Sequence, residues 1–251
     1  MKGQWLIALA KRVLEKSLHP SDALNYLFWR IHHTDTLTID KIKFSQVDHT
    51  LWSLAGETFI RREYCPAGFE ISPNSIVIDI GAHRGVFVGF ASRRNPRQIL
   101  AIEPNRENFH QLQSFVTQNK LSNITLLNKA VSSQDGEVKL YRSTHSRHSI
   151  QKQLHSENLF ETVQAISLDS LLAPYERIDF LKMDCEGEEY EILRAANANS
   201  LERIQTLSME IHNINQDVLV AGLYSKLSSS FSCVEIKPLS PTLGMLYAQK
   251  R

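Results

Sequence analysis

The chain has 251 residues, of which 42% are hydrophobic, and its 28 basic and 27 acidic side chains leave a formal net charge of +1. This balance provides no global field that would draw the protein onto nucleic acid or a membrane, and the three widely spaced cysteines lack the pattern of a zinc site or a disulfide framework. We therefore expect a cytoplasmic protein in a reducing compartment, with enough apolar residues for one α/β domain and additions to it.

Residues 1–74 are predicted to form an N-terminal extension of helices and strands that helps to cover a substrate cleft. Its first segment, residues 4–18, has an amphipathic helical pattern that is too short for a membrane span and lacks the features of a signal peptide. Two interpretations of this helix stay open, because it could dock on the rest of the protein or contact a membrane surface or a partner. The further predicted elements are a helix over 21–33 capped by Ser21 and strands over 36–44 and 57–64.

Residues 75–251 are predicted to form the main domain, because continuous apolar runs typical of buried strands alternate with helical segments. The predicted strands are 75–82, 98–104, 123–132, 137–143, 163–172, 177–184 and 204–212, with a closing hairpin over 233–249. The predicted helices are 85–94, 105–120, 188–196 and 216–231. This alternation indicates an α/β fold with a mostly parallel sheet, helices on both faces and an antiparallel C-terminal edge hairpin.

Ligands of such sheets bind at the carboxyl ends of the strands, where the first two ends carry a glycine loop and an acid. A carboxylate at Glu103 can accept hydrogen bonds from ribose hydroxyls, as in sites for NAD and for S-adenosylmethionine. In the loop G-A-H-R-G, His83 stands at the second glycine of the dinucleotide fingerprint and leaves less room for a pyrophosphate. The loop therefore favours S-adenosylmethionine and disfavours the alternative of a nicotinamide oxidoreductase. The predicted cofactor-binding residues are Asp79, Gly81, Ala82, His83, Gly85, Glu103, Asn105, Ala130 and Asp184.

Four stretches together resemble the FkbM-type methyltransferases: "VIDIGAHRG", "AIEPN", "NKAVSSQDGEVKLY" and "FLKMDCEGEEYEIL". The resemblance covers roughly residues 70–250, and its most specific part is the pattern K-x-D-x-E-G-x-E that follows the fourth strand of the main sheet. It implies a class I, Rossmann-like, S-adenosylmethionine-dependent fold and O-methylation of a hydroxyl on a sugar, glycan or small natural product. The family usually has asparagine where this chain has His83.

Methyl transfer to a hydroxyl needs a base that removes the hydroxyl proton during attack. The candidate catalytic residues at the ends of the fourth and fifth strands are Asp184, Glu186, Glu210 and His212. Glu186 and His212 are the leading pair, and Asp184 is expected closer to the cofactor. The following Glu188, Glu189 and Glu191 are interpreted as residues of a helix start or of the surface. A divalent metal, Mg²⁺ or Mn²⁺, is an alternative that the spacing does not require, and no metal ligand is assigned.

The absence of an Asp/Asn-Pro-Pro-aromatic motif and of a Pro-Cys nucleophile argues against methylation of nucleic acid bases. A small molecule or a glycan is therefore the expected acceptor, and no nucleic acid partner is expected. The polar segment 142–160 is either a loop that faces the acceptor, through Arg142, His145, Arg147 and His148, or a solvated loop. A protein that binds S-adenosylmethionine without transferring a methyl group, in a regulatory or partner role, stays open as the alternative function. The oligomeric state is not predicted.

Overall fold

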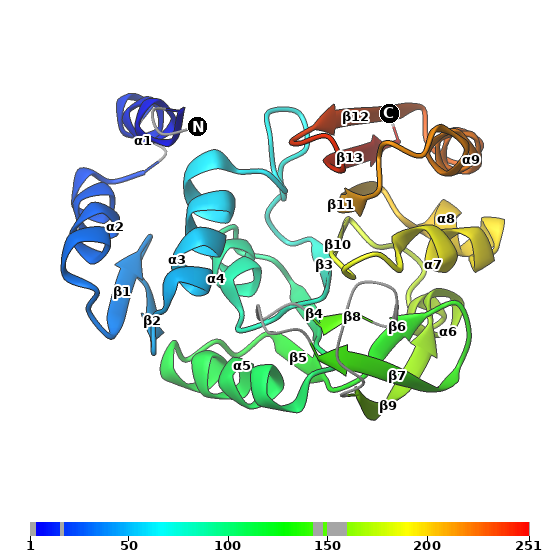
Figure 1. Ribbon diagram of the computed structural model, residues 1–251, viewed down its shortest axis with the longest axis horizontal. Helices are drawn as coiled ribbons and strands as arrows, with labels where there is room; N and C mark the ends of the chain where they lie inside the picture. Colours follow the sequence, from blue (N-terminus) through cyan, green and yellow to red (C-terminus); the bar gives the residue numbers. More distant parts are fainter. Residues whose placement is uncertain (1–3, 16–17, 143–147, 150–159, 251) are drawn as a thin grey trace.

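A computed structural model describes residues 4–15, 18–142, 148–149 and 160–250 of the chain. Its centre is a seven-stranded sheet in the order β12-β13-β11-β10-β3-β4-β5 (Figure 1). The strands are β3 (Ile76–Ile80), β4 (Gln98–Ile102), β5 (Ile124–Leu127), β10 (Phe180–Met183), β11 (Thr206–His212), β12 (Cys233–Pro238) and β13 (Leu243–Gln249). Neighbours from β5 to β11 run parallel, whereas β13 runs antiparallel to both β11 and β12. The hairpin is therefore at the edge of the sheet as predicted, with β12 outermost.

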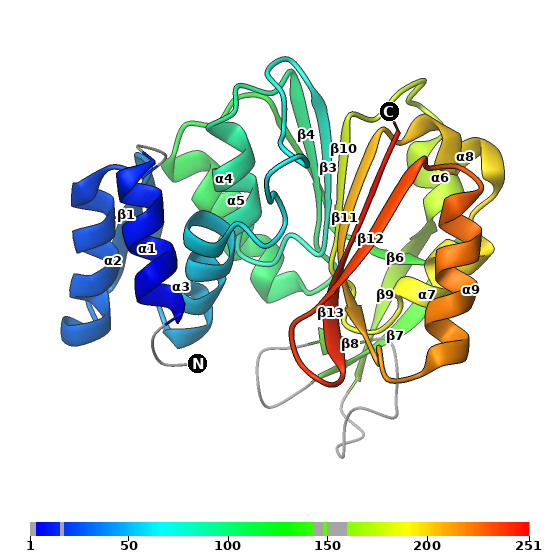
Figure 2. The ribbon, with the colours of Figure 1, turned by 90° about the horizontal axis from the view of Figure 1, so that it is seen from above.

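Helices cover both faces of this sheet, as the continuous apolar runs predicted. They are α4 (Val86–Ser92), α5 (Arg106–Gln118), α7 (Glu189–Ala195), α8 (Ala198–Arg203) and α9 (Asp217–Ser228). Side chains alternate between the faces, so that Val77 packs in a core with α4 and α5, while Ile78 packs in a second core with α7, α8 and α9. Figure 2 shows the sheet edge-on between these two layers. Helix α8 was not predicted.

The direction of chain progression reverses between β3 and β10, which are adjacent and parallel. From β3 the chain moves outward through β4 to β5, and from β10 it moves the other way to β11. Loops that follow β3 and β10 therefore separate at this point and leave room for a ligand between them. Most of the predicted site residues lie on these loops, after β4 and on the end of β11, whereas Asp79 is within β3 and Ala130 begins β6 (Ala130–Ser132).

Two segments that were each predicted as one strand are divided in the structure, and both contribute to a second sheet. The predicted strand 123–132 divides into β5 and β6 (Ala130–Ser132), because the chain leaves the main sheet at Asn128. The predicted strand 163–172 ends early and continues as the helix α6 (Leu168–Leu172), capped by Ser167. The second sheet has the order β6-β9-β7-β8, formed with β7 (Gly136–Arg142), β8 (His148–Ser149) and β9 (Phe160–Ser167).

The N-terminal extension differs from its prediction in four places, one of which is the helix α3 (His49–Ala55), which was not predicted. Its elements are α1 (Gln4–Leu14), α2 (Pro20–His32), β1 (Thr36–Ile39), β2 (Ile42–Ser45), α3 (His49–Ala55) and the π-helix η1 (Gly56–Arg61). The N-cap of α2 is His19, whose ring accepts from the backbone of Ser21, so Ser21 is not the cap. The segment 36–44 is a hairpin, because Asp40 and Lys41 turn the chain in the left-handed region with φ of 50° and 64°. The segment 57–64 is largely helical and forms no strand.

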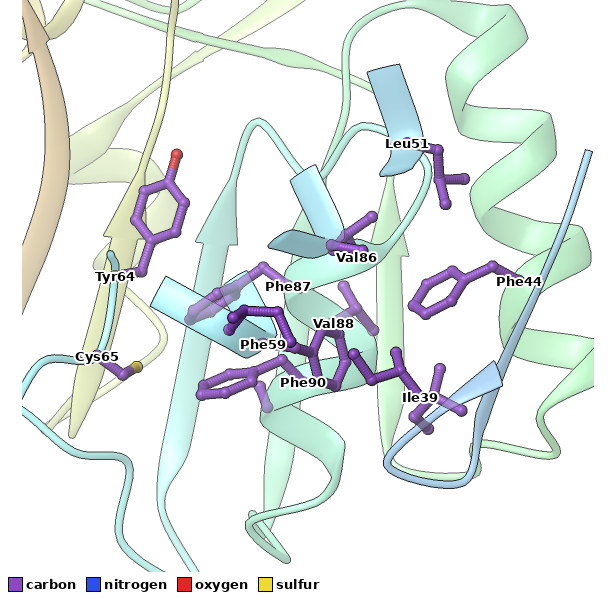
Figure 3. Packing of buried hydrophobic residues seen from close by; sticks show 14 of the residues in the cluster. Ile39, Phe44, Leu51, Phe59, Tyr64, Cys65, Val86, Phe87, Val88 and Phe90 are labelled. Atoms are coloured by element: carbon purple, nitrogen blue, oxygen red, sulfur yellow. The ribbon is translucent and has the colours of Figure 1, made fainter. Parts of the chain in front are cut away.

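The extension packs against α4 and α5 through aromatic side chains (Figure 3). Phe44 stacks on Phe115 with ring centroids 5.1 Å apart, and Phe59 meets Phe90 edge-on at 5.4 Å. These contacts join the extension and one face of the sheet in a single hydrophobic core. In the part of the chain that the structure describes, every helix falls short of the length and apolar character needed to cross a membrane.

Candidate active site

A cavity of about 650 Å³ lies at the carboxyl ends of β3, β4, β10 and β11. The extension closes one side of it, because His49 and Ser53 of α3 and Glu57 of η1 line the cavity. Of the predicted cofactor-binding residues, those that line the cavity are Gly81, Ala82, His83, Glu103, Ala130 and Asp184. Of the predicted catalytic residues, Asp184, Glu186 and Glu210 line it. Among these sets, Asp79, Gly85, Asn105 and His212 do not.

The glycine loop after β3 is held in one conformation by its surroundings. Gly81 has φ +76°, and a Cβ built there would lie 1.9 Å from the carbonyl oxygen of Asp184. The backbone N–H groups of Gly81 and Ala82 both donate to the carbonyl of Ile102, at 3.0 and 2.9 Å. Gly85 is also left-handed, and a Cβ there would be 2.6 Å from the Phe115 ring. Gly81 therefore allows β3 and β10 to approach, and Gly85 allows α4 to begin against α5.

Glu103 is an acceptor on the wall of the cavity whose two oxygens are both held by backbone N–H groups. Its Oε2 accepts from the backbone N–H of His83 at 2.8 Å, and its Oε1 accepts from that of Asn105 at 2.9 Å. The side chain is 5% exposed, and burial raises the pKa of Glu103 to about 7. Each oxygen retains a lone pair for a ligand hydroxyl. Asn105 itself caps α5 by accepting from the backbone N–H of Asn108 at 3.0 Å.

His83 contributes a neutral ring to the same wall. Burial lowers the pKa of His83 to about 4, so that the imidazole carries no charge at neutral pH. Its Nδ1 is buried and makes no hydrogen bond within the protein. A polar atom in this condition is available to a ligand in the cavity.

A buried ion pair behind the cavity ties the two loops together. Lys182 of β10 lies opposite Asp79 of β3 in the sheet, and its Nζ is 3.1 Å from Asp79 Oδ1. The same ammonium donates to the carbonyl of Gly81 at 2.8 Å and is 4.0 Å from Asp184 Oδ2. Sequence reasoning gave Lys182 no role, although a lysine in a buried strand directly before Asp184 is a signal in its own right.

The carboxylates of the fourth and fifth strand ends surround His212. Its Nε2 is 3.4 Å from Glu186 Oε2 and 3.4 Å from Glu210 Oε1, while its Nδ1 is 3.4 Å from Glu189 Oε1. Burial alone would lower the pKa of His212, but the carboxylates outweigh it and raise the pKa to about 11. His212 is therefore a cation at neutral pH. Burial and the nearby charge of Asp184 raise the pKa of Glu210 to about 9.

Glu189 begins α7, as predicted, but its side chain is not on the surface. Its side chain is fully buried, and its Oε1 accepts from the backbone N–H of Cys185 at 3.0 Å and of Gly187 at 3.1 Å. Glu189 thus fixes the loop that carries Glu186, whereas Glu191 is partly exposed and pairs with Arg194 as a surface residue does. The last acid of the K-x-D-x-E-G-x-E pattern was the signal for this role.

Two residues of the extension enter the site that the sequence did not indicate. The hydroxyl of Tyr64 donates to Asp184 Oδ2 at 2.8 Å. Glu57 lines the cavity and accepts from the hydroxyl of Ser53 at 2.9 Å, and burial raises the pKa of Glu57. Both lie in the segment that was predicted as a strand, where no motif singles out a functional side chain.

The lining of the cavity is acidic. Among the residues that the structure describes, the acidic side chains on its wall are Glu57, Glu103, Asp184, Glu186 and Glu210, and the lysines are Lys129 and Lys182. Within the same residues, no group of three or more histidine, cysteine, aspartate or glutamate side chains has an arrangement that could hold a metal ion. The basic segment 142–160 lies largely outside the described residues, which include none of 143–147 or 150–159.

Comparison with known protein families identifies the part of the chain that carries these residues. The family model described as the methyltransferase FkbM domain matches residues 79–229, which is more than half of the chain. Among curated proteins there is no match.

Three solved structures illustrate the similarities. A methyltransferase FkbM from Methylobacillus flagellatus KT has 15% identity and a TM-score of 0.49, over 80% of this chain and 55% of that chain. A putative methyltransferase from Streptococcus mutans in complex with SAH has 14% identity and a TM-score of 0.46, over 71% and 90%. An rRNA methylase from Streptococcus thermophilus has 12% identity and a TM-score of 0.46, over 72% and 90%.

The sheet order and the antiparallel β13 are those of the class I methyltransferase fold, so the predicted fold class is confirmed. The match begins at Asp79, next to the glycine loop, and includes Glu103 and the carboxylates that end β10 and β11. The chain belongs to the FkbM family of S-adenosylmethionine-dependent methyltransferases.

Proposed function

We propose that the protein transfers a methyl group from S-adenosylmethionine to a hydroxyl group of a small molecule or glycan. The main support for the proposal is a single cavity whose two sides differ in chemistry. One wall presents the glycine loop and Glu103, and the other presents the carboxylates of Asp184, Glu186 and Glu210. S-adenosylmethionine, when bound, supplies an electrophilic methyl group and a neutral leaving group.

The residues present fit this cofactor. Glu103 offers two lone pairs at fixed positions to ribose hydroxyls, because backbone N–H groups hold both of its oxygens. The cavity also has apolar surface suited to the adenine base of the cofactor, contributed by Pro104, Ala130 and Val131. The amide of Asn128 donates to the carbonyls of Glu103 and Pro104 at 2.8 and 3.0 Å, which keeps the ends of β4 and β5 together.

Proton removal is proposed for Glu186, which lines the cavity 3.4 Å from Nε2 of His212. Glu210 also lines the cavity 3.4 Å from the same nitrogen, but with a pKa of about 9 it is protonated at neutral pH and is proposed to donate a hydrogen bond there. His212 was a leading candidate base, but a protonated imidazole that does not line the cavity has no lone pair to offer there. We propose that its positive charge positions the two carboxyl groups. Asp184 accepts from the hydroxyl of Tyr64, and its Oδ2 is 4.0 Å from Nζ of Lys182.

The acceptor is proposed to bind between this pair and the extension. The cavity is enclosed on that side by α3 and η1, which contribute His49, Ser53, Glu57 and Thr58 to its wall. Residues 1–74 would thus cover the substrate cleft, as the sequence predicted. Carboxylates on several sides repel phosphate groups and offer hydrogen-bond acceptors to hydroxyls. The geometry therefore supports a neutral or cationic polyhydroxylated acceptor in preference to nucleic acid.

The proposal is tested by single-turnover methyl transfer with labelled S-adenosylmethionine and a panel of sugars, glycosides and amino sugars. Glu186→Gln should lower the rate by roughly 10²- to 10⁴-fold, the range for loss of a positioned general base, whereas Glu210→Gln, which keeps a hydrogen-bond donor, should lower it less. Cofactor affinity, measured by calorimetry, should remain within about two-fold of wild type. Glu191→Gln is the matched control, because that carboxylate is partly exposed and pairs with Arg194.

The outcomes separate the proposal from binding without chemistry. Binding of S-adenosylmethionine with no methyl transfer to any member of the panel would favour a regulatory or partner role. Transfer that survives in Glu186→Gln and is insensitive to chelator would remove Glu186 as the base. Loss of transfer on chelation, with recovery in Mg²⁺ or Mn²⁺, would replace the general base with metal chemistry.

A further inference from the structure

Exposed apolar side chains are concentrated on the first two helices. Of the large hydrophobic residues that the structure places in contact with solvent, six belong to α1 and α2: Leu6, Ile7, Leu14, Leu24, Phe28 and Ile31. We call these six residues the N-terminal apolar surface. Figures 1 and 2 both place α1 and α2 at one end of the molecule, on the far side of α3 from the sheet.

These side chains form a face distinct from the one that packs inward. On α2, Leu24, Phe28 and Ile31 are spaced by four and three residues and so share one side of the helix, with exposures of 65%, 52% and 72%. Tyr26 and Trp29 of the same helix point the other way and are buried. Helix α2 is therefore apolar on two sides, although folding uses only one of them.

Helix α1 repeats this arrangement. Ile7 and Leu14 are seven residues apart, on one side of the helix, with exposures of 71% and 82%, while Leu9 is buried against the protein. Contiguous exposed apolar side chains are uncommon in proteins that function as free monomers and mark surfaces that contact another phase or molecule. Lys11 is also exposed on α1.

The charge of this region favours one binding partner of the N-terminal apolar surface over another. The first 33 residues contain five basic residues and two acidic ones, a net charge of +3, so the rest of the chain carries −2 of the total of +1. In a symmetric dimer through this surface, the same positive region would face itself, and like charges would oppose association. An anionic lipid surface instead offers negative charge at its headgroups and an apolar layer beneath them.

We propose that α1 and α2 dock the protein on the surface of an anionic lipid bilayer. The apolar side chains of the two helices enter the boundary between headgroups and acyl chains, and exposed cations such as Lys11 contact the headgroups. The helices lie on the membrane and do not cross it. Arg12 of α1 donates through Nε to the carbonyl of Ile60 in η1 at 3.1 Å, so docking holds the segment that lines the cavity close to the membrane.

The test is sedimentation of the full chain with vesicles of phosphatidylcholine alone or mixed with phosphatidylglycerol. Wild-type protein should sediment with the mixed vesicles and be released by high salt. The double variants Ile7→Ser with Leu14→Ser and Phe28→Ser with Ile31→Ser should each reduce the partition coefficient by at least about ten-fold, because two inserted side chains return to water. Because all four positions are exposed, circular dichroism and thermal unfolding should match wild type.

Val218→Ser with Tyr224→Ser is the matched control, since it removes two exposed apolar side chains from α9, with exposures of 85% and 48%, and should bind as wild type does. Failure of the wild-type chain to bind mixed vesicles would overturn the proposal, as would equal binding by all variants. Equal binding to uncharged vesicles would overturn the role of charge. A dimer in sedimentation velocity that the α1 or α2 variants dissociate, without vesicle binding, would assign the surface to a second copy of the chain.

Discussion

Replacing Glu103 by glutamine tests the cofactor wall of the cavity with the smallest change of shape. The substitution keeps one carbonyl acceptor, but it removes the charge and places an amide group opposite one of the N–H donors of His83 or Asn105. Hydrogen bonds to a charged acceptor are worth about 1.5–3 kcal/mol each. Loss of one such bond predicts that affinity for S-adenosylmethionine falls by about ten- to a hundred-fold.

The pH dependence sharpens this prediction. With a pKa of about 7, Glu103 is mostly protonated at pH 6 and mostly ionised at pH 8. If ribose hydroxyls donate to the ionised form, wild-type affinity should rise by about ten-fold from pH 6 to pH 8. Glu103→Gln should lose this dependence, whereas the control Glu191→Gln should keep it.

Stability should respond in the opposite direction in the absence of ligand. The pKa of Glu103 is raised from 4.5 to about 7 in the folded protein, so the folded state binds more protons than the unfolded state between these values. Its contribution to stability therefore falls as the pH rises through this window. Urea unfolding at pH 5 and pH 8 should show a larger loss in wild type than in Glu103→Gln. Calorimetry that gives equal cofactor affinity in wild type and variant at both pH values would refute the assignment of Glu103.

The remaining predictions concern the frame around the site. Lys182→Met should lower the free energy of unfolding by about 3–5 kcal/mol, because Asp79 is left buried without its partner, and denaturant titration would contradict this with a loss below about 1 kcal/mol. Tyr64→Phe should cost about 1.5–3 kcal/mol through the lost bond to Asp184, measured in the same way. Gly81→Ala should abolish folding or cofactor binding, and a native thermal transition with wild-type affinity would contradict the close approach at this glycine. His212→Gln should destabilise the protein most at low pH, because the stabilising charge is fully present below the ordinary pKa of 6.5 and is lost as the pH rises through about 11; a deficit that grows from pH 6 to pH 9 would contradict the pairing.

The sequence predicted which strand ends carry the site better than it predicted which side chains contact each other there. Gly81, Glu103, Asp184, Glu186 and Glu210 line one cavity because parallel strands bring their carboxyl ends to the same edge, which the strand pattern alone implies. Local pattern does not indicate which neighbour a side chain meets across the sheet. Asp79 meets Lys182 and His212 meets three carboxylates through contacts between residues far apart in the chain.

The extension was the least predictable region, for a related reason. Short apolar runs such as 57–64 fit a strand or a helix equally well, and the surrounding core decides between them. In this chain Phe59 packs on Phe90, and residues 56–61 form a π-helix. Glu57 of this helix lines the cavity, and no local pattern indicated its place there.

The division of the site between two parts of the chain bears on what family membership conveys. The matched residues 79–229 include Glu103, which is proposed to bind the cofactor, and Glu186, which is proposed to remove the proton. Glu57 and Tyr64 lie outside the match, yet Tyr64 donates to Asp184 and Glu57 lines the cavity. Because the extension lines the side proposed for the acceptor, we expect the choice of acceptor to depend on this chain's own extension more than on the family. Substitution of Glu57 should therefore change which acceptor is methylated, and the affinity for S-adenosylmethionine should stay the same.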